Sequence, residues 1–219
     1  MPYKLLQENI SYNFKNIQLL ELAFVHKSFD NKHNNERLEF LGDSILNSVI
    51  AQYLFLKFPN EKEGLLTRMR AHLVKAESLT KKSLELSLDD YIKLSKGTAN
   101  LSSDRKNSIL EDSFEALIGS IFLDSGWDQV NMITLNIFNK ELLSLSADTE
   151  FKDSKTELQE LLQSMKLELP KYIIEAMNTG FTCSIEFEGN TFKASGPSKQ
   201  SAETDAASLA LIHIKGSND

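Results

Sequence analysis

Apolar residues recur at spacings of three and four along the first two thirds of the chain, a pattern typical of amphipathic α-helices rather than of strands. Turn-forming and polar residues interrupt this pattern at 59–64, 97–107 and 125–126. The spacing predicts helices over residues 17–29, 38–58, 65–86, 109–123 and 130–143. Residues 1–143 are therefore predicted to form a mostly α-helical domain.

The pattern changes after a polar stretch at residues 144–152, which is predicted to be a linker. Beyond it, an amphipathic helix is predicted at 156–165 and an alanine-rich helix at 200–214. Between them, the alternation of residues and a turn signal predict three short strands, at 171–177, 181–187 and 191–195. The order α-β-β-β-α predicts a small α+β domain over residues 153–219.

Composition restricts the classes of protein to which the chain could belong. A single cysteine, Cys183, excludes an internal disulfide and fits a reducing, cytoplasmic location. No segment approaches the roughly 18 apolar residues of a membrane span, so no membrane partner is expected. The net charge of −7 argues against nucleic acid as a partner, because phosphates attract Lys and Arg. However, a protein that concentrates its carboxylates at one metal site can bind RNA with another surface.

Acidic residues gather on one face of each of two predicted helices. At about 100° per residue, Glu36, Glu39 and Asp43 fall within an arc of roughly 60°. Asp112 and Glu115 repeat this spacing on the helix at 109–123. Gly119 lies on the same side of that helix, where its missing side chain would leave room for a ligand or for another backbone.

These acidic faces have two interpretations that spacing alone leaves open. They can be the solvated sides of ordinary amphipathic helices. Alternatively, they can hold a cation, since Glu36 and Glu39 are followed four residues later by Phe40 and Asp43 instead of Lys or Arg. Carboxylate oxygens in such a cluster suit Mg²⁺ or Mn²⁺.

Phe40 projects beside the carboxylates and away from the predicted core face of its helix. A large aromatic residue in this position is either a chance exposed side chain or a contact to another chain. The second interpretation predicts that the acidic face borders a subunit interface.

Three segments resemble the ribonuclease III family. The sequence NERLEFLGD at residues 35–43 is similar to the signature of the family, and SILEDSFEALIG at 108–119 resembles its second catalytic segment. Glu63-Gly64-Leu65, followed by Arg68 and Arg70, resembles a third segment. The C-terminal part resembles the double-stranded-RNA-binding domain that follows the nuclease domain in bacterial members.

This resemblance implies an endoribonuclease that hydrolyses double-stranded RNA, including precursors of ribosomal and messenger RNA, to 5′-phosphate and 3′-hydroxyl ends. Mg²⁺, for which Mn²⁺ could substitute, would be held by the set Glu39, Asp43, Asp112 and Glu115. Asp43 and Glu115 would also be catalytic, with Glu36 and Glu63 as auxiliary acids. The family acts as a homodimer, and Phe40 falls at a position associated with the dimer contact. The four histidines do not cluster at catalytic spacing, and His26 is expected to have a packing or hydrogen-bonding role.

The resemblance also predicts the residues that contact RNA. On the helix at 156–165 these are Thr156, Gln159, Glu160 and Gln163, which would face the minor groove, and before the last helix they are Ser198 and Lys199, which would meet phosphates.

The chain departs from the family pattern in several places. Gln200 replaces a second basic residue after Lys199, and the loop Asn178-Thr179-Gly180 is short and lacks a histidine. Residues 150–219 carry 7 Lys or Arg against 11 Asp or Glu, so weak and salt-sensitive RNA binding is expected. Ser102-Ser103 and Thr98 also differ from the residues common in the family, but they lie in a loop outside the carboxylate set.

The sequence leaves two alternatives to the nuclease hypothesis. The first is a catalytically silent relative that binds double-stranded RNA on the same scaffold, which would be expected to have lost at least one metal ligand. The second is an unrelated helical protein whose acidic faces bind Ca²⁺ or a basic partner, which the length of the match at residues 35–43 opposes.

Overall fold

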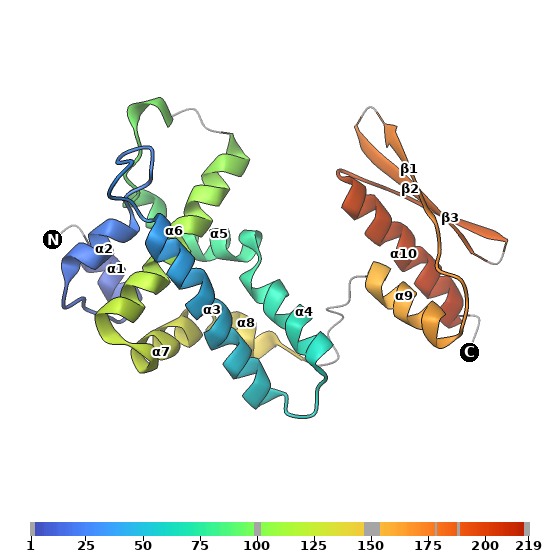
Figure 1. Ribbon diagram of the computed structural model, residues 1–219, viewed down its shortest axis with the longest axis horizontal. Helices are drawn as coiled ribbons and strands as arrows, with labels where there is room; N and C mark the ends of the chain where they lie inside the picture. The colour runs from blue at the N-terminus through green and yellow to red at the C-terminus, as the bar shows by residue number, and fades with distance from the viewer. Residues whose placement is uncertain (1–2, 99–101, 147–153, 178, 188, 217–219) are drawn as a thin grey trace. The chain divides into compact units, whose positions relative to one another are not determined.

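The computed structural model describes residues 3–98, 102–146, 154–177, 179–187 and 189–216. The chain separates into two compact units, Met1–Glu150 and Phe151–Asp219, which Figure 1 shows in different colours of the chain gradient. The linker predicted at residues 144–152 begins at the end of a helix, at Ser144. Residues 147–152 of this linker lie outside the described residues.

The first unit is built from α-helices, which confirms the predicted mostly α domain. Two short 3₁₀ turns, at Leu88–Asp90 and Lys96–Thr98, lie between the fifth and sixth helices. The helices in chain order are α1 (Lys4–Asn9), α2 (Ile17–Ala23), α3 (Glu36–Lys57), α4 (Glu63–Val74), α5 (Ala76–Glu85), α6 (Ser103–Ser125), α7 (Trp127–Ile137) and α8 (Asn139–Ser144).

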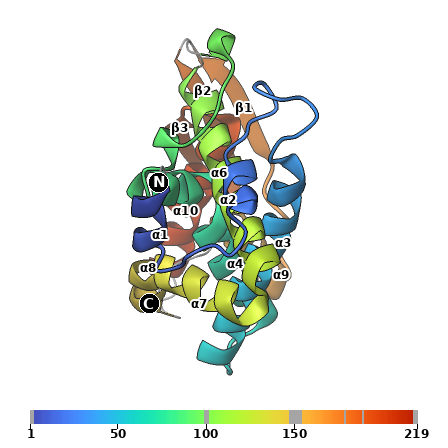
Figure 2. The same ribbon diagram turned by 90° about the vertical axis from the view of Figure 1, so that its left-hand side faces the viewer.

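The two long helices α3 and α6 form the centre of this unit, and they lie side by side in both views of the ribbon (Figures 1 and 2). On α6 the apolar residues Phe114, Leu117, Ile118 and Ile121 are fully buried. On α3 the buried stripe consists of Leu38, Gly42, Leu46, Val49, Ile50 and Leu54, whereas Leu41 and Ile45 are only half-buried. Each fully buried aliphatic or aromatic side chain stabilises the fold by about 1.5–3 kcal/mol.

Several helices are shorter than the apolar spacing predicts, because a predicted helix either ends early or is divided in two. The helix expected at 17–29 ends at Ala23, because the next residues turn to pair with another segment: Val25 forms a parallel bridge with Lys93. The helix expected at 65–86 is two helices, since Lys75 has an extended backbone with φ −64° and ψ 151°. Apolar residues on both sides of each break contact the same core, so the spacing alone cannot reveal these breaks.

The second unit has the predicted order α-β-β-β-α: α9 (Ser154–Ser164), β1 (Tyr172–Met177), β2 (Gly180–Phe187), β3 (Asn190–Gly196) and α10 (Lys199–Gly216). The strands form one antiparallel sheet in the order β1-β2-β3. The core of the second unit lies between the sheet and the two helices. It consists of Leu158, Leu162, Cys183, Ile185, Ala202, Ala206, Ala207, Ala210, Leu211 and Ile214. The small alanine side chains allow α10 to lie close to the sheet.

The backbones of α3 and α6 meet at two glycines. A Cβ atom added to Gly42 would lie 1.7 Å from the carbonyl oxygen of Glu115, and one added to Gly119 would lie 2.3 Å from that of Leu38. Contacts this short are impossible for a side chain, so both positions require glycine for close approach of the two helices. The space that the sequence leaves at Gly119 is therefore occupied by the backbone of α3.

This crossing predicts that Gly119→Ala destabilises the first unit by about 2–3 kcal/mol, because the methyl group would force the two backbones apart. The matched control is Gly64→Ala on α4, where the added Cβ would meet Arg68 at an ordinary 3.6 Å. This variant should be within about 1 kcal/mol of the original protein. The single tryptophan, Trp127, lies in the first unit, so urea unfolding followed by its fluorescence measures both effects. Equal stability of the two variants would contradict the proposed role of the crossing.

Candidate functional site

The crossing of α3 with α6 brings the two acidic faces together. Besides burial, which is the largest cause, the charge of Asp112 on α6 raises the pKa of Glu39 on α3. In the same way, burial and then the charge of Asp43 on α3 raise the pKa of Glu115 on α6. Helical spacing positions these side chains within each helix, and the glycine contact positions the helices relative to each other. We call Glu36, Glu39, Asp43, Glu111, Asp112 and Glu115 the acidic cluster.

Burial and mutual repulsion disfavour the charged forms of this cluster. Burial raises the pKa of Glu115 to about 8, and the charges of Asp43 and Glu111 contribute to the shift. Burial is also the largest cause of the raised pKa of Glu39 and of Asp112. A carboxyl group whose pKa is raised by like charges gains most from a nearby cation, because the cation offsets the repulsion.

Glu111 belongs to this cluster, although the sequence reasoning did not single it out. Burial raises its pKa, followed by the charges of Asp112 and Asp43. The signal for Glu111 was present in the sequence, because it precedes Glu115 by four residues and so shares its side of α6.

Glu36 and Asp43 mark the two ends of the acidic cluster along α3. The side-chain amide of Asn47 donates a hydrogen bond of 2.7 Å to the Asp43 carboxylate, which holds it in place one turn away. Glu36 accepts a hydrogen bond of 3.0 Å from the ammonium of Lys27. The lack of Lys or Arg four residues after Glu36 does not leave it unpaired, because its partner comes from the loop before α3, which helix spacing cannot show.

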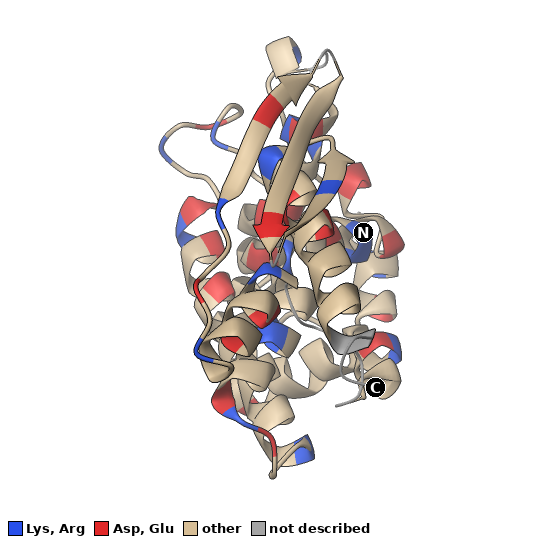
Figure 3. Ribbon diagram, turned by 90° about the vertical axis from the view of Figure 1, so that its right-hand side faces the viewer, with Lys and Arg blue, Asp and Glu red and all other residues tan. Residues whose placement is uncertain are grey.

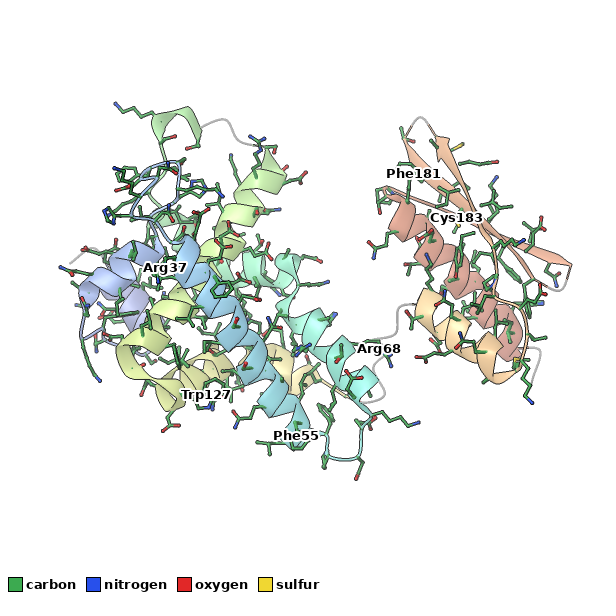
Figure 4. All side chains as sticks on the ribbon, viewed as in Figure 1. Arg37, Phe55, Arg68, Trp127, Phe181 and Cys183 are labelled. Carbon is green, nitrogen blue, oxygen red and sulfur yellow. The ribbon has the colours of Figure 1, made fainter. Side chains whose placement is uncertain are left out.

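Glu63 lies away from the acidic cluster of its own chain. It begins α4, where it accepts a hydrogen bond of 2.7 Å from the hydroxyl of Thr67. Together with Phe55, it lines a groove of about 320 Å³ between α4 and the C-terminal half of α3. Phe55 and Glu39 are separated by about 24 Å along the helix, and Figure 4 shows Phe55 near the end of α3 opposite to that of Arg37.

Phe40 is 77% exposed, next to the acidic cluster. It borders a groove of about 680 Å³ that is lined by α2, by residues 32–34 of the following loop, by α3 and by the end of α6. The apolar residues of this lining are Leu19, Leu22, Leu38, Phe40, Leu41 and Leu123, and its charged residues on α3 are Glu36 and Arg37. An exposed phenylalanine beside an apolar groove is typical of a surface that contacts protein.

The residues expected to contact RNA are accessible in the second unit. On α9, Thr156, Glu160 and Gln163 are exposed and Gln159 is half-buried, all on one side of the helix. Ser198 accepts a hydrogen bond of 3.1 Å from the backbone N–H of Ser201 and so caps α10. In Figure 3, acidic residues lie among the basic ones on the sheet and helices of this unit.

Lys199 begins α10, and its ammonium lies 5.7 Å from the centre of the Phe181 ring. This cation–π contact orients the only charged residue among the predicted contacts at the start of α10.

Within the part of the chain that the structure describes, no helix is long and apolar enough to cross a membrane.

Comparisons with known proteins cover both units. Residues 16–142 match the family model described as ribonuclease-III-like, and residues 154–214 match the double-stranded RNA binding motif. The Ribonuclease 3 of Idiomarina loihiensis is 43% identical, over 99% of this chain and 97% of that protein. The Ribonuclease 3 of Aliarcobacter butzleri is 40% identical, over 97% of this chain and 98% of that protein.

Among solved structures, the nuclease domain of ribonuclease III from Campylobacter jejuni aligns with a TM-score of 0.61 and 42% identity, covering 63% of this chain and 96% of that domain. The likeness to the curated relatives runs along nearly the whole chain, and both matched segments coincide with the two units of the fold. The chain therefore belongs to the ribonuclease III family, with a nuclease domain followed by a double-stranded-RNA-binding domain.

Proposed function

We propose that this chain, a ribonuclease III-type endoribonuclease, uses Mg²⁺ to hydrolyse phosphodiester bonds of double-stranded RNA and leaves 5′-phosphate and 3′-hydroxyl ends. Its substrates would be precursors of ribosomal and messenger RNA in the cytoplasm. The observation that carries this proposal is the convergence of Glu39, Asp43, Asp112 and Glu115 at the α3–α6 crossing, where burial and like charges raise the pKa of Glu115 to about 8.

The chemistry of these donors fits a hard divalent cation such as Mg²⁺, for which Mn²⁺ would substitute. Among the described residues, no three acidic, histidine or cysteine side chains already stand where they could hold one ion together. Mg²⁺ tolerates such an open arrangement, because it keeps several waters and is commonly bound by one or two carboxylates together with substrate phosphates. When bound, the ion would supply an activated water and offset the charge that develops on the phosphate.

The residues of the chain have separate tasks in this mechanism. Glu39, Asp43, Asp112 and Glu115 would bind and orient the cation, and Asn47 holds the carboxylate of Asp43 in position. Asp43 and Glu115 would also be the catalytic pair, since Asp43 contributes the largest charge effect, after burial, to the raised pKa of Glu115 on the other helix. Glu36 would be an auxiliary acid at the edge of the cluster, where Lys27 holds it.

Glu63 cannot join the acidic cluster of its own chain, given its position at the other end of α3. An auxiliary role for Glu63 therefore requires that it acts on another part of the duplex or in the site of a second subunit.

The proposed assembly is a homodimer in which Phe40 contacts the second subunit. Its support is the 77% exposure of Phe40 and the adjoining apolar groove of about 680 Å³. The Campylobacter jejuni structure is described as showing flexibility in a region involved in dimer formation of its nuclease domain. A dimer that buries Phe40 would remove a large apolar side chain from water beside the active site.

The second unit would hold the duplex through Thr156, Gln159, Glu160 and Gln163 on α9 and through Ser198 and Lys199 before and at the start of α10. Polar side chains on α9 suit the minor groove of RNA, which displays 2′-hydroxyl groups. Lys199 and the N-terminus of α10 suit phosphates.

The assignment of Glu115 to the site predicts the effect of its replacement on RNA cleavage. Glu115→Gln should lower the cleavage rate of a fully paired RNA in Mg²⁺ by roughly 100-fold or more while RNA binding is retained, because it removes one ligand and one charge from the cluster. The rate is measured by gel electrophoresis of cleaved RNA, and binding is measured by gel shift without Mg²⁺.

The matched control is Asp89→Asn, which neutralises an exposed acid far along the sequence from the cluster and should cleave at the original rate. Equal cleavage by the original protein and by Glu115→Gln would refute the assignment of the site. No cleavage by the original protein would instead favour the catalytically silent relative.

A further prediction concerns RNA binding by the acidic second unit. Gln200→Lys, made in the inactive Glu115→Gln full chain, should tighten RNA binding several-fold and steepen its salt dependence by about one counterion, because it adds one phosphate contact. A gel-shift titration at several salt concentrations measures both. The control Thr191→Lys adds the same charge at the opposite end of β3, an exposed position, and should have a smaller effect. If both variants bound equally, net charge and not the start of α10 would control binding.

A further inference from the structure

The loop between α2 and α3 is held rigidly at both ends. At its start, the backbone N–H of Lys93 donates a hydrogen bond of 2.8 Å to the carbonyl of Phe24. At its end, the buried Asn35 donates from its backbone to Val25, at 2.8 Å, and from its side chain to Ala23, at 3.3 Å. The residues between these anchors therefore have a defined position next to the N-terminal end of α3.

His26 and Ser28 hold this loop on either side of Lys27. The backbone N–H of Ser28 donates to the Nδ1 atom of His26 at 3.1 Å, so Nδ1 is an acceptor and the ring is neutral. The hydroxyl of Ser28 lies 2.8 Å from the same nitrogen and accepts a hydrogen bond of 3.2 Å from the backbone of Ser95. Burial lowers the pKa of His26, which agrees with the neutral form.

Lys27 projects from this anchored turn toward the acidic cluster. Its ammonium forms an ion pair of 3.0 Å with Glu36, and its charge also acts on Asp112 and Glu39. The Lys27 side chain is 58% exposed, so it can exchange partners without unfolding the loop. Lys27 thus places one positive charge at the edge of a site proposed to bind a cation.

We propose that Lys27 is a positioning residue that sets the affinity of the acidic cluster for divalent cations. Lys27 holds Glu36 in an ion pair at the edge of the cluster. Its positive charge also repels a divalent cation that approaches Glu39 and Asp112. This inference rests on the proposed function, since it assumes that the cluster binds a divalent cation.

The physical consequence is a site that binds a cation weakly on its own. Without Lys27, the cluster would carry one more unbalanced negative charge and Glu36 would be free to turn toward the ion. With Lys27 present, tight binding of Mg²⁺ requires the phosphates of an RNA duplex, which can act as further ligands for the ion. An ordinary surface ion pair would have no such effect, because exposed pairs contribute little to stability and nothing to a distant ligand.

The test measures Mn²⁺ binding by the full chain without RNA, from the electron paramagnetic resonance signal of free Mn²⁺ at low ionic strength. Lys27→Met should bind Mn²⁺ about three- to fivefold more tightly than the original protein, and the difference should shrink at high salt. Lys27→Arg, which keeps the charge, should bind within about twofold of the original protein. Lys140→Met removes the same charge from an exposed position on α8, and should also leave the affinity within about twofold.

Unchanged or weaker Mn²⁺ binding by Lys27→Met would overturn the inference, since a merely structural role predicts loss of affinity and never a gain. Thermal unfolding of each variant verifies that it is folded, and Lys27→Gln provides a second neutral side chain with the same expectation. Absence of Mn²⁺ binding by the original protein would overturn the proposed metal site and this inference together. Tight Mn²⁺ binding that is the same with and without Lys27 would overturn the inference alone.

Discussion

The contact between the backbones of α3 and α6 is the constraint on which the rest of the first unit depends. Gly42 and Gly119 lie on the facing sides of the two helices, and neither position has room for even one methyl group. This close approach aligns the buried stripes of the two helices and at the same time brings their acidic faces together. One pair of glycines therefore serves both the core and the proposed active site, and a change that separates the helices would disturb both.

The acidic cluster has an energetic cost that its surroundings offset only in part. Half-buried carboxyl groups on both helices repel one another, and burial raises the pKa values of Glu39, Asp112 and Glu115. The folded chain has a counter-charge at the edge of this site, where Lys27 pairs with Glu36. The remaining repulsion fits the proposal that this cluster binds a divalent cation, which would act in the RNA hydrolysis of a ribonuclease III family member.

The two units differ in how their charged and polar side chains would serve an acidic protein that acts on RNA. The first concentrates negative charge where the proposed chemistry requires it, and the second presents polar side chains on α9 and a single lysine at the start of α10. Shape recognition of a duplex through 2′-hydroxyl groups needs little positive charge, whereas long-range attraction needs much. The negative charge of residues 150–219 therefore indicates that this unit contributes contact geometry more than electrostatic attraction.

The sequence by itself determined the fold class, the order of elements in the second unit and the grouping of acids along each helix, because helix and strand periodicity are local properties. It also indicated two of the three family segments, those that bear acids of the cluster, since residues 35–43 and 108–119 are each continuous in the chain. Glu111 was accessible to the same reasoning, at four residues before Glu115, but was not singled out.

Only the tertiary structure decided which groups meet across the chain. It showed that the space at Gly119 is filled by α3, that Lys27 reaches Glu36 from a loop anchored to Lys93, and that Glu63 lies at the far end of α3. It also showed that α2 ends at Ala23, because the residues after it form a long-range bridge with Lys93 instead of the predicted helix. Each of these results depends on contacts between residues distant in sequence, and a local periodic pattern contains no information about such contacts.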